Sequence, residues 1–189
     1  ALVLLQQASG RGHALANPWV GESEASQQVR KQIAQLQGEP GPILIEGESG
    51  TGKEVVCHLI HAQSPHSPFI KVNMAAIPEN LFESEFFGHV KGAFTGAQNN
   101  KMGLAEAAHG GDLFLDEIEA LPLHHQAKLL RFLETGEVKR VGSDKTISVH
   151  TRVIAATNRN LESMVQNSQF REDLLWRLNG KKIQLPPLR

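Results

Sequence analysis

One glycine-rich run, placed between an apolar stretch and an amphipathic one, has the residue types that hold an anion. The run reads Gly47-Glu48-Ser49-Gly50-Thr51-Gly52-Lys53-Glu54. Its glycines allow the backbone to turn tightly, so that successive N–H groups face inward around phosphate oxygens. The helix expected next adds the positive end of its dipole, and the lysine reaches the terminal phosphates. The run therefore predicts a phosphate-binding loop (P-loop) rather than a glycine-rich turn that happens to contain a lysine.

The last residue of this run departs from the general P-loop motif. The motif ends in Ser or Thr, whose hydroxyl ligates magnesium, and Glu54 stands in that place. A magnesium ion must then be held by Thr51, by water or by another carboxylate. The sequence leaves these three possibilities open.

Two acids, Asp116 and Glu117, follow the apolar run 113–115. Ligands of parallel α/β sheets bind at the carboxyl ends of the strands, so we expect both side chains at that edge. There Asp116 would orient magnesium, through water, and Glu117 would polarise an attacking water, because phosphoryl transfer depends mainly on positioning and charge stabilisation. The alternative is a pair of acids stabilised by a helix N-terminus. The upstream P-loop favours the hydrolytic interpretation.

Polar residues also end two other expected strands. Asn73 follows one of them, and Thr157 with Asn158 follows another. The Thr-Asn pair could sense the terminal phosphate from the neighbouring strand. Asn and Thr after a strand are ordinarily turn residues, so these three positions are ambiguous by themselves.

The elements that would position these residues alternate between strand and helix. Apolar residues at helical spacing predict helices over 23–37 and 123–134, and a further helix follows the P-loop. Short apolar runs predict buried strands at 43–45, 69–72, 113–115 and 153–156. Alternating Val138, Val141, Ile147 and Val149 predict a hairpin. This order predicts an α/β fold with a mostly parallel sheet and helices on both faces.

The composition excludes several other classes of protein. Hydrophobic residues make up 40% and charged residues 21%, the balance of a soluble chain with a buried core. A net charge of -1 gives no bulk attraction to nucleic acid, and no apolar run reaches the length of a membrane span. Cys57 is the only cysteine, so it forms no internal disulfide and is expected as a small buried residue. The nine histidines show no metal-site spacing.

A hexapeptide between the second strand and the acid pair has no role in nucleotide chemistry. It reads Gly92-Ala93-Phe94-Thr95-Gly96-Ala97, and it follows Glu83-Ser84-Glu85-Phe86-Phe87-Gly88-His89. Together with the P-loop, the acid pair and the run 170–174, it resembles the central AAA+ domain of sigma-54-dependent bacterial transcription activators. The resemblance extends from about Val20 to Arg189. An exposed Phe94 suggests a partner surface; the alternative is a phenylalanine folded back into the core.

The resemblance implies a role for each matching residue of the nucleotide site. Lys53 binds phosphate, and Asp116 with Glu117 forms the Walker B pair. Asn73 restrains the catalytic glutamate until the site is set. Further positions at the nucleotide are Val20, Gly21 and the first sensor, Thr157 and Asn158.

The resemblance also implies residues that act between molecules. Arg171 and Arg177 match two arginines supplied in trans to the ATP of the next subunit; without the resemblance they would be ordinary solvated arginines. Phe94 and Thr95 match the loop tip that touches sigma-54. Glu54 is the usual residue of the family at its position.

The implied activity is ATP hydrolysis with Mg²⁺, coupled to remodelling of the sigma-54 RNA polymerase closed complex by a ring, usually a hexamer. The expected fold is a P-loop NTPase (AAA+) αβα sandwich over 19–189, truncated before its helical lid, with 1–18 as a linker or a remnant of an upstream region. Promoter or enhancer DNA would be bound by a domain absent from this chain. The expected location is the cytoplasm, with no membrane partner.

Two other functions remain open at this point. One is another AAA+ remodelling ATPase, which would have no need of Phe94-Thr95. The other is a nucleotide-dependent assembly module without turnover. The two acids and two arginines argue against that module, and the missing lid argues for it.

Overall fold

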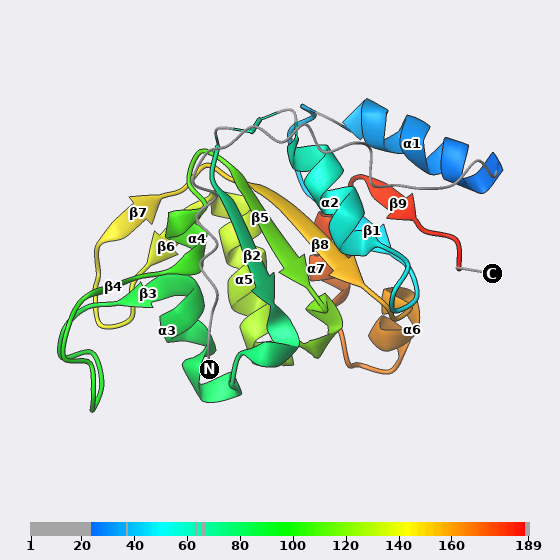
Figure 1. Cartoon of the computed structure of the whole chain (residues 1–189). Helices are drawn as coiled ribbons and strands as arrows, with labels where there is room; N and C mark the ends of the chain where they lie inside the picture. Colours follow the sequence, from blue (N-terminus) through cyan, green and yellow to red (C-terminus); the bar gives the residue numbers. More distant parts are fainter. Residues whose placement is uncertain (1–23, 37, 63, 66, 188–189) are drawn as a thin grey trace.

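A central five-stranded sheet organises the protein in a computed structural model that describes residues 24–36, 38–62, 64–65 and 67–187 (Figure 1). All of its strands run parallel, in the order β2-β5-β8-β1-β9. Their bounds are β1 Ile43–Glu46, β2 Phe69–Asn73, β5 Asp112–Asp116, β8 Arg152–Thr157 and β9 Lys182–Gln184. The four predicted apolar strands are present. The α/β fold with a parallel sheet is therefore confirmed, and β9 is a strand that the sequence did not predict.

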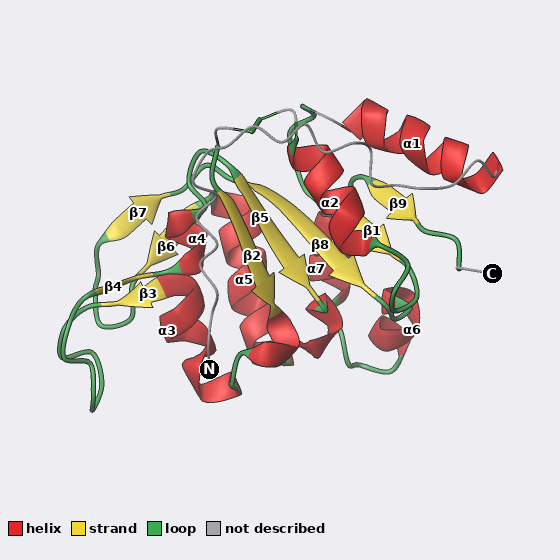
Figure 2. Ribbon diagram, in the orientation of Figure 1, coloured by secondary structure: helices red, strands yellow, loops and turns green. Residues whose placement is uncertain are grey.

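Helices cover both faces of this sheet (Figure 2). On one face lie α1 (Glu24–Leu36) and α2 (Lys53–His61); the other face is covered by α5 (Leu123–Thr135) and α7 (Glu172–Leu178), with α3 (Phe82–Phe87) beside them. Shorter helical elements are η1 Met74–Ala76, η2 Glu79–Leu81, α4 Leu104–Ala107, η3 Ile118–Ala120 and α6 Leu161–Gln166. The predicted helices and the three-layer arrangement are confirmed.

Alternation along the strands divides the apolar side chains between two cores. In β1, Ile43 and Ile45 pack with α1 and α2, whereas Leu44 packs into the core of α5 and α7. Phe114 and its neighbours in β5 are divided in the same way. Side chains of successive strand residues point to opposite faces, so a strand buried on both faces is apolar throughout. Cys57 is buried in the α2 core, and its burial raises the pKa of the thiol well above its usual range.

Two small antiparallel sheets lie beside the main one. They are formed by β3 (Gly88–His89) with β4 (Lys101–Met102) and by β6 (Glu137–Lys139) with β7 (Thr146–Ser148). The second is the predicted hairpin. A parallel bridge between His89 and Val141 joins β3 to the connection between β6 and β7. The hexapeptide loop connects β3 to β4, and the β6–β7 hairpin contacts β3 beside it.

A buried ionic cluster stabilises the amino edge of the main sheet. Asp112, at the start of β5, accepts hydrogen bonds from Arg152 Nε (2.7 Å) and pairs with His61 Nδ1 (2.7 Å). Burial alone would raise the pKa of Asp112, but the hydrogen bonds with His61 and Arg152 outweigh it and lower the pKa.

Within the described part of the chain, no helix is long and apolar enough to cross a membrane.

Candidate active site

The sequence-predicted polar residues meet at the carboxyl edge of the main sheet. The P-loop follows β1, Thr157 ends β8, Asp116 ends β5 and Asn73 ends β2. In the strand registers, Glu46 lies opposite Thr157, and Asn73 lies opposite Asp116. Because β8 lies between β1 and β5, its end separates the P-loop from the acid pair.

Backbone conformation and hydrogen bonds give the P-loop its shape. Gly50 and Gly52 have φ angles of 82° and 88°, a region that L residues other than glycine rarely adopt. The buried Thr51 donates from Oγ1 to Glu48 O at 2.8 Å. Lys53 Nζ donates to Gly47 O and to Glu48 O, each at 2.8 Å. The lysine side chain thus lies across the P-loop, and its ammonium donates to two backbone carbonyl groups of that loop.

Glu54 is engaged away from the P-loop. Its carboxylate forms an ion pair with Lys71 of β2 at 2.6 Å and lies 3.7 Å from His58 Nε2 of α2. The hydrogen bond from Lys71 holds the pKa of Glu54 below its usual value, despite an opposing effect of burial. The glutamate at the Ser/Thr position of the motif is therefore bound to a cation of the protein itself.

The acid pair adopts an uncommon backbone conformation. Glu117 has φ 54° and ψ 49°, the left-handed region, and is one of two non-glycine residues with positive φ in the described part of the chain. Its N–H donates to Asp116 Oδ1 at 3.0 Å. Both side chains are half-buried. Left-handed non-glycine residues are concentrated at functional sites, where the surrounding structure offsets the strain. Here the left-handed turn lies at the end of the buried strand β5, so both acids lie at the carboxyl edge of the sheet.

The other strand-end polar residues also form hydrogen bonds: those of Asn73 and Thr157 are local, and that of Asn158 reaches the turn after β5. Asn73 Oδ1 accepts from Ala75 N at 2.9 Å, which caps η1 rather than contacting Glu117. The fully buried Thr157 accepts from Arg159 N at 3.1 Å. Asn158 is exposed, and its N–H donates to Glu119 Oε1 at 3.3 Å.

Glu119 is a residue that sequence reasoning missed, although it lies two positions after the acid pair. Its Oε1 holds the backbone of Asn158, while Oε2 is buried and has no hydrogen-bond partner among the described residues. The contact joins the turn after β5 to the end of β8. An acid so close to Asp116 and Glu117 in the sequence was a visible signal for it.

The donor set at this edge fits magnesium held together with a phosphate ligand. Magnesium is bound through one or two carboxylates, several waters and substrate phosphates rather than by an all-protein cage. Asp116 ends β5 and Glu117 follows it, so carboxylates are available at this edge, and no group of three or more His, Cys, Asp or Glu among the described residues forms such a cage.

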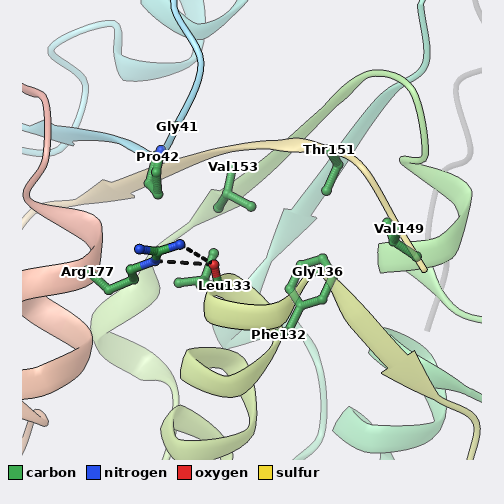
Figure 3. A pocket seen from close by; sticks show the side chains of 9 residues that line it. All are labelled: Gly41, Pro42, Phe132, Leu133, Gly136, Val149, Thr151, Val153 and Arg177. Carbon is green, nitrogen blue, oxygen red and sulfur yellow. Dashed lines mark hydrogen bonds between the residues drawn. The ribbon is translucent and has the colours of Figure 1, made fainter. Parts of the chain in front are cut away.

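Arg171 and Arg177 lie at opposite ends of α7. Arg171 is the N-cap residue, and its guanidinium donates to Asp173 of the first turn at 3.0 and 2.7 Å. Arg177, in the last turn, donates to the carbonyl of Leu133 at 2.8 and 3.2 Å (Figure 3). Both side chains are partly exposed to solvent.

The position of Arg177 separates it from the P-loop of its own chain. It lines a small cavity with Pro42, which precedes β1, and with Val153, near the start of β8. The P-loop and Thr157 lie at the other ends of these strands. From Val153 to Thr157, four residues of extended chain span ~13 Å. Arg177 therefore lies towards the amino edge of the sheet.

The hexapeptide forms a tight loop that projects from the molecule. Gly92 and Gly96 have φ angles of 82° and 100°, and Gly92 N donates to Ala97 O at 2.8 Å, which closes the loop. At the tip Phe94 is 41% exposed and meets the His89 ring edge-on at 5.0 Å. Figure 1 shows this green loop at the lower left, far from the β1–α2 loop at the right. Phe94 and Thr95 border an open groove of 840 Å³ beside α3 and α5.

Val20 and Gly21, two further positions expected at the nucleotide, lie outside the described residues. The same holds for the expected linker over 1–18.

Residues 19–184 match the family model of the Sigma-54 interaction domain. The chain is 52% identical over 183 residues to the Nif-specific regulatory protein of Klebsiella oxytoca, covering 96% of this chain and 35% of that protein. It is 53% identical over 172 residues to the DNA-binding transcriptional regulator NtrC of Escherichia coli K12, covering 90% and 37%.

A solved structure is similar as well. The crystal structure of NtrX from Brucella abortus in complex with ATP superimposes with a TM-score of 0.81 at 40% identity, covering 88% of this chain and 38% of that one. The chain spans about a third of the length of these two curated relatives. The P-loop, the acid pair at the end of β5 and the hexapeptide loop occur within the matched region. By this match and these identities, the chain belongs to the family of Sigma-54 interaction domains.

Proposed function

We propose that this chain binds Mg²⁺-ATP at the carboxyl edge of its sheet and hydrolyses it. The observation that carries the proposal is the order of strand ends: the P-loop after β1, Thr157 at the end of β8, and the acid pair after β5. A phosphate chain held by the P-loop would extend past Thr157 towards Asp116 and Glu117. The complex of the similar NtrX with ATP supports the same ligand here.

Lys53 is the residue that changes partner when nucleotide binds. It donates to Gly47 O and Glu48 O in this structure, and both bonds can be exchanged for bonds to phosphate oxygens. The lysine ammonium is attracted more strongly by an anionic phosphate oxygen than by a neutral carbonyl oxygen, so phosphate is the preferred partner. The N–H groups of the P-loop and of the start of α2 add further donors.

Asp116 and Glu117 would have different roles in hydrolysis. Magnesium supplies positive charge that neutralises the phosphates when it is bound, and Asp116 would hold it through water. Glu117 would orient and polarise the attacking water. Asn73 would restrain Glu117 after leaving its cap on Ala75 N, and Thr157 with Asn158 would contact the terminal phosphate.

Arg171 and Arg177 would act on the nucleotide of a neighbouring subunit. The support for this proposal is that Arg177 lies towards the opposite edge of the sheet from its own P-loop. A cation that serves an adjacent molecule stabilises transition-state charge only after assembly. Hydrolysis would therefore depend on a ring, for which a hexamer is the expected form.

The coupled process would be activation of sigma-54 RNA polymerase at its promoter. Membership in the Sigma-54 interaction domain family supports it, as does the exposed tip formed by Phe94 and Thr95. The loop lies far from the P-loop, so it would transmit a nucleotide-driven change to the closed complex rather than take part in hydrolysis. Such transmission requires that the loop contact its partner differently in different nucleotide states.

The experiment that tests the site compares two variants in ATP binding and phosphate release. Lys53→Ala should lose ATP binding, because a charge-assisted contact of ~1.5–3 kcal/mol or more disappears. Glu117→Gln should still bind ATP while hydrolysis falls by ~10² to 10⁴. Unchanged affinity in Lys53→Ala, or a joint loss of binding and turnover in Glu117→Gln, would contradict the assigned roles.

The coupling step has its own measurement. Thr95→Ala and Phe94→Leu should leave ATP turnover within a few-fold of the wild type and abolish capture of purified sigma-54 in the presence of ADP–aluminium fluoride. A native-gel shift and an ATPase assay on the same protein give both readouts. If the variants still captured sigma-54, the hexapeptide loop would not be the coupling surface, and the protein would be an ATPase that acts on another target.

A further inference from the structure

Three charged side chains from different elements meet beside the start of the P-loop. Lys182 Nζ of β9 lies 2.9 Å from Glu46 Oε2 and 3.4 Å from Glu162 Oε1 of α6. Glu46 is the last residue of β1 and immediately precedes Gly47. The lysine therefore places a positive charge between two carboxylates, one of which belongs to the residue that precedes the P-loop.

Glu46 is the member of this group that most needs a counter-charge. Its side chain is only 12% exposed, and its Oε1 is buried without a hydrogen-bond partner among the described residues. Burying an ionised carboxylate is costly unless an opposite charge lies beside it. Burial alone would lower the pKa of Lys182, but the hydrogen bond to Glu46 and the charges of Glu46 and Glu162 outweigh it and raise the pKa.

Contacts of Leu185, three residues after Lys182, reach Glu46 and the start of the P-loop. Leu185 N donates to Glu46 O at 2.7 Å, and a Cβ added at Gly47 would lie 2.9 Å from Leu185 Cβ. Gly47 O is in turn one of the two acceptors of Lys53 Nζ. Glu46 is bonded directly to Gly47, so a shift of Glu46 would move the first residue of the P-loop, and a change in its charge would act at close range on that residue.

We propose that Lys182 is a positioning residue for nucleotide: by neutralising Glu46, it prevents an uncompensated carboxylate from repelling the phosphates and holds the start of the P-loop in place. This inference rests on the proposed binding of ATP. Coulomb repulsion scales with the charge of the ligand. Lys182 should therefore matter most for ATP, less for ADP and not at all for adenosine.

The neighbouring lysine provides a matched control. Lys181 Nζ contacts Glu39 Oε2 at 3.2 Å and Pro40 O, residues that precede β1 at the other end of the strand. Lys182→Gln and Lys181→Gln remove the same charge from adjacent positions of the chain. Only the first leaves Glu46 without its cation.

The experiment is a fluorescence titration of each variant with ATP, ADP and adenosine at low and high salt, with thermal unfolding of the ligand-free protein measured in parallel. Lys182→Gln should raise the Kd for ATP about tenfold, a change that corresponds to ~1.4 kcal/mol. The effect should be smaller for ADP and should shrink at high salt, because salt screens the added repulsion. Lys181→Gln and Lys182→Arg should bind like the wild type, and Glu46→Gln combined with Lys182→Gln should restore affinity.

Several results would overturn the positioning role. They are equal Kd values for Lys182→Gln and Lys181→Gln, an equal loss for ATP and adenosine, and a double variant that remains weak. If Lys182→Gln does not fold, Glu46→Gln alone gives the answer: it should tighten ATP binding a few-fold in a salt-dependent way, and no change would refute the inference. A wild-type protein that binds no nucleotide would instead overturn the proposed function, and this role with it.

Discussion

The carbonyl of Glu48 accepts two side-chain hydrogen bonds, from Thr51 Oγ1 and from Lys53 Nζ, each at 2.8 Å. If Lys53 turns to phosphate, the Thr51 hydroxyl is the side-chain donor that remains. Thr51→Val keeps the shape of this buried side chain and removes the donor. A neutral hydrogen bond contributes ~0.5–1.5 kcal/mol, and the loss falls mainly on the nucleotide-bound state. The Kd for ATP should therefore rise about two- to tenfold.

The assay is a titration with ATP in the presence and in the absence of Mg²⁺, and Thr51→Ser serves as the control that retains the hydroxyl. The serine variant should bind like the wild type, and the valine variant should lose the same factor in both conditions. A loss of about a hundredfold or more that appears only with Mg²⁺ would exceed one neutral hydrogen bond. It would mean that Thr51 ligates the metal, and the structural role argued for it would be refuted.

Three further predictions concern assembly, loop geometry and pH. Mixing Arg177→Ala with Lys53→Ala protein should restore some ATP turnover if the arginine acts in trans; no rescue at any ratio, despite demonstrated co-assembly, would exclude that role. Gly47→Ala should abolish nucleotide binding, because its new methyl group would lie 2.7 Å from Thr51 Oγ1 and 2.9 Å from Leu185 Cβ; wild-type affinity by calorimetry would contradict the crowding. Asp112→Asn should destabilise the fold at pH 7 by about 3 kcal/mol or more, since it removes the negative charge that is paired with the largely buried side chain of Arg152. Because the pKa of Asp112 is lowered in the folded state, its contribution is complete above the unfolded pKa of about 3.9 and is lost as the pH falls through the folded pKa. Urea unfolding of both proteins should therefore show a difference that shrinks as the pH falls below about 4; a constant difference would contradict the linkage.

The proposed chemistry could be read from the sequence where it depends on local order. The P-loop is one uninterrupted run whose glycines meet a backbone requirement, and the structure has Gly50 and Gly52 at the positive φ angles that such a loop needs. The acid pair likewise follows a run of apolar residues that forms a strand buried on both faces. In each case the short apolar run predicts the strand, and the polar residues after it must then lie at the strand end.

Other features depended on contacts between distant segments. β9 has only three residues, two of them polar and exposed, so it carries no strand pattern; it is a strand because β1 offers a parallel edge. Glu54 could have faced a metal or solvent, and its pairing with Lys71 follows from where α2 lies beside β2. That Arg177 turns to Leu133 O follows from the packing of α7 on α5.

The sequence alone therefore determined the residue types at the site, the strands that precede them and the family, because these are properties of short continuous runs. Only the tertiary structure decided which strand ends are neighbours. The order β2-β5-β8-β1-β9 sets Thr157 between the P-loop and the acid pair, and it brings Lys182 to Glu46, 136 positions earlier in the chain. Such pairings are selected by the packing of whole helices and strands, whose energy is spread over many side chains and has no counterpart in any one stretch of sequence.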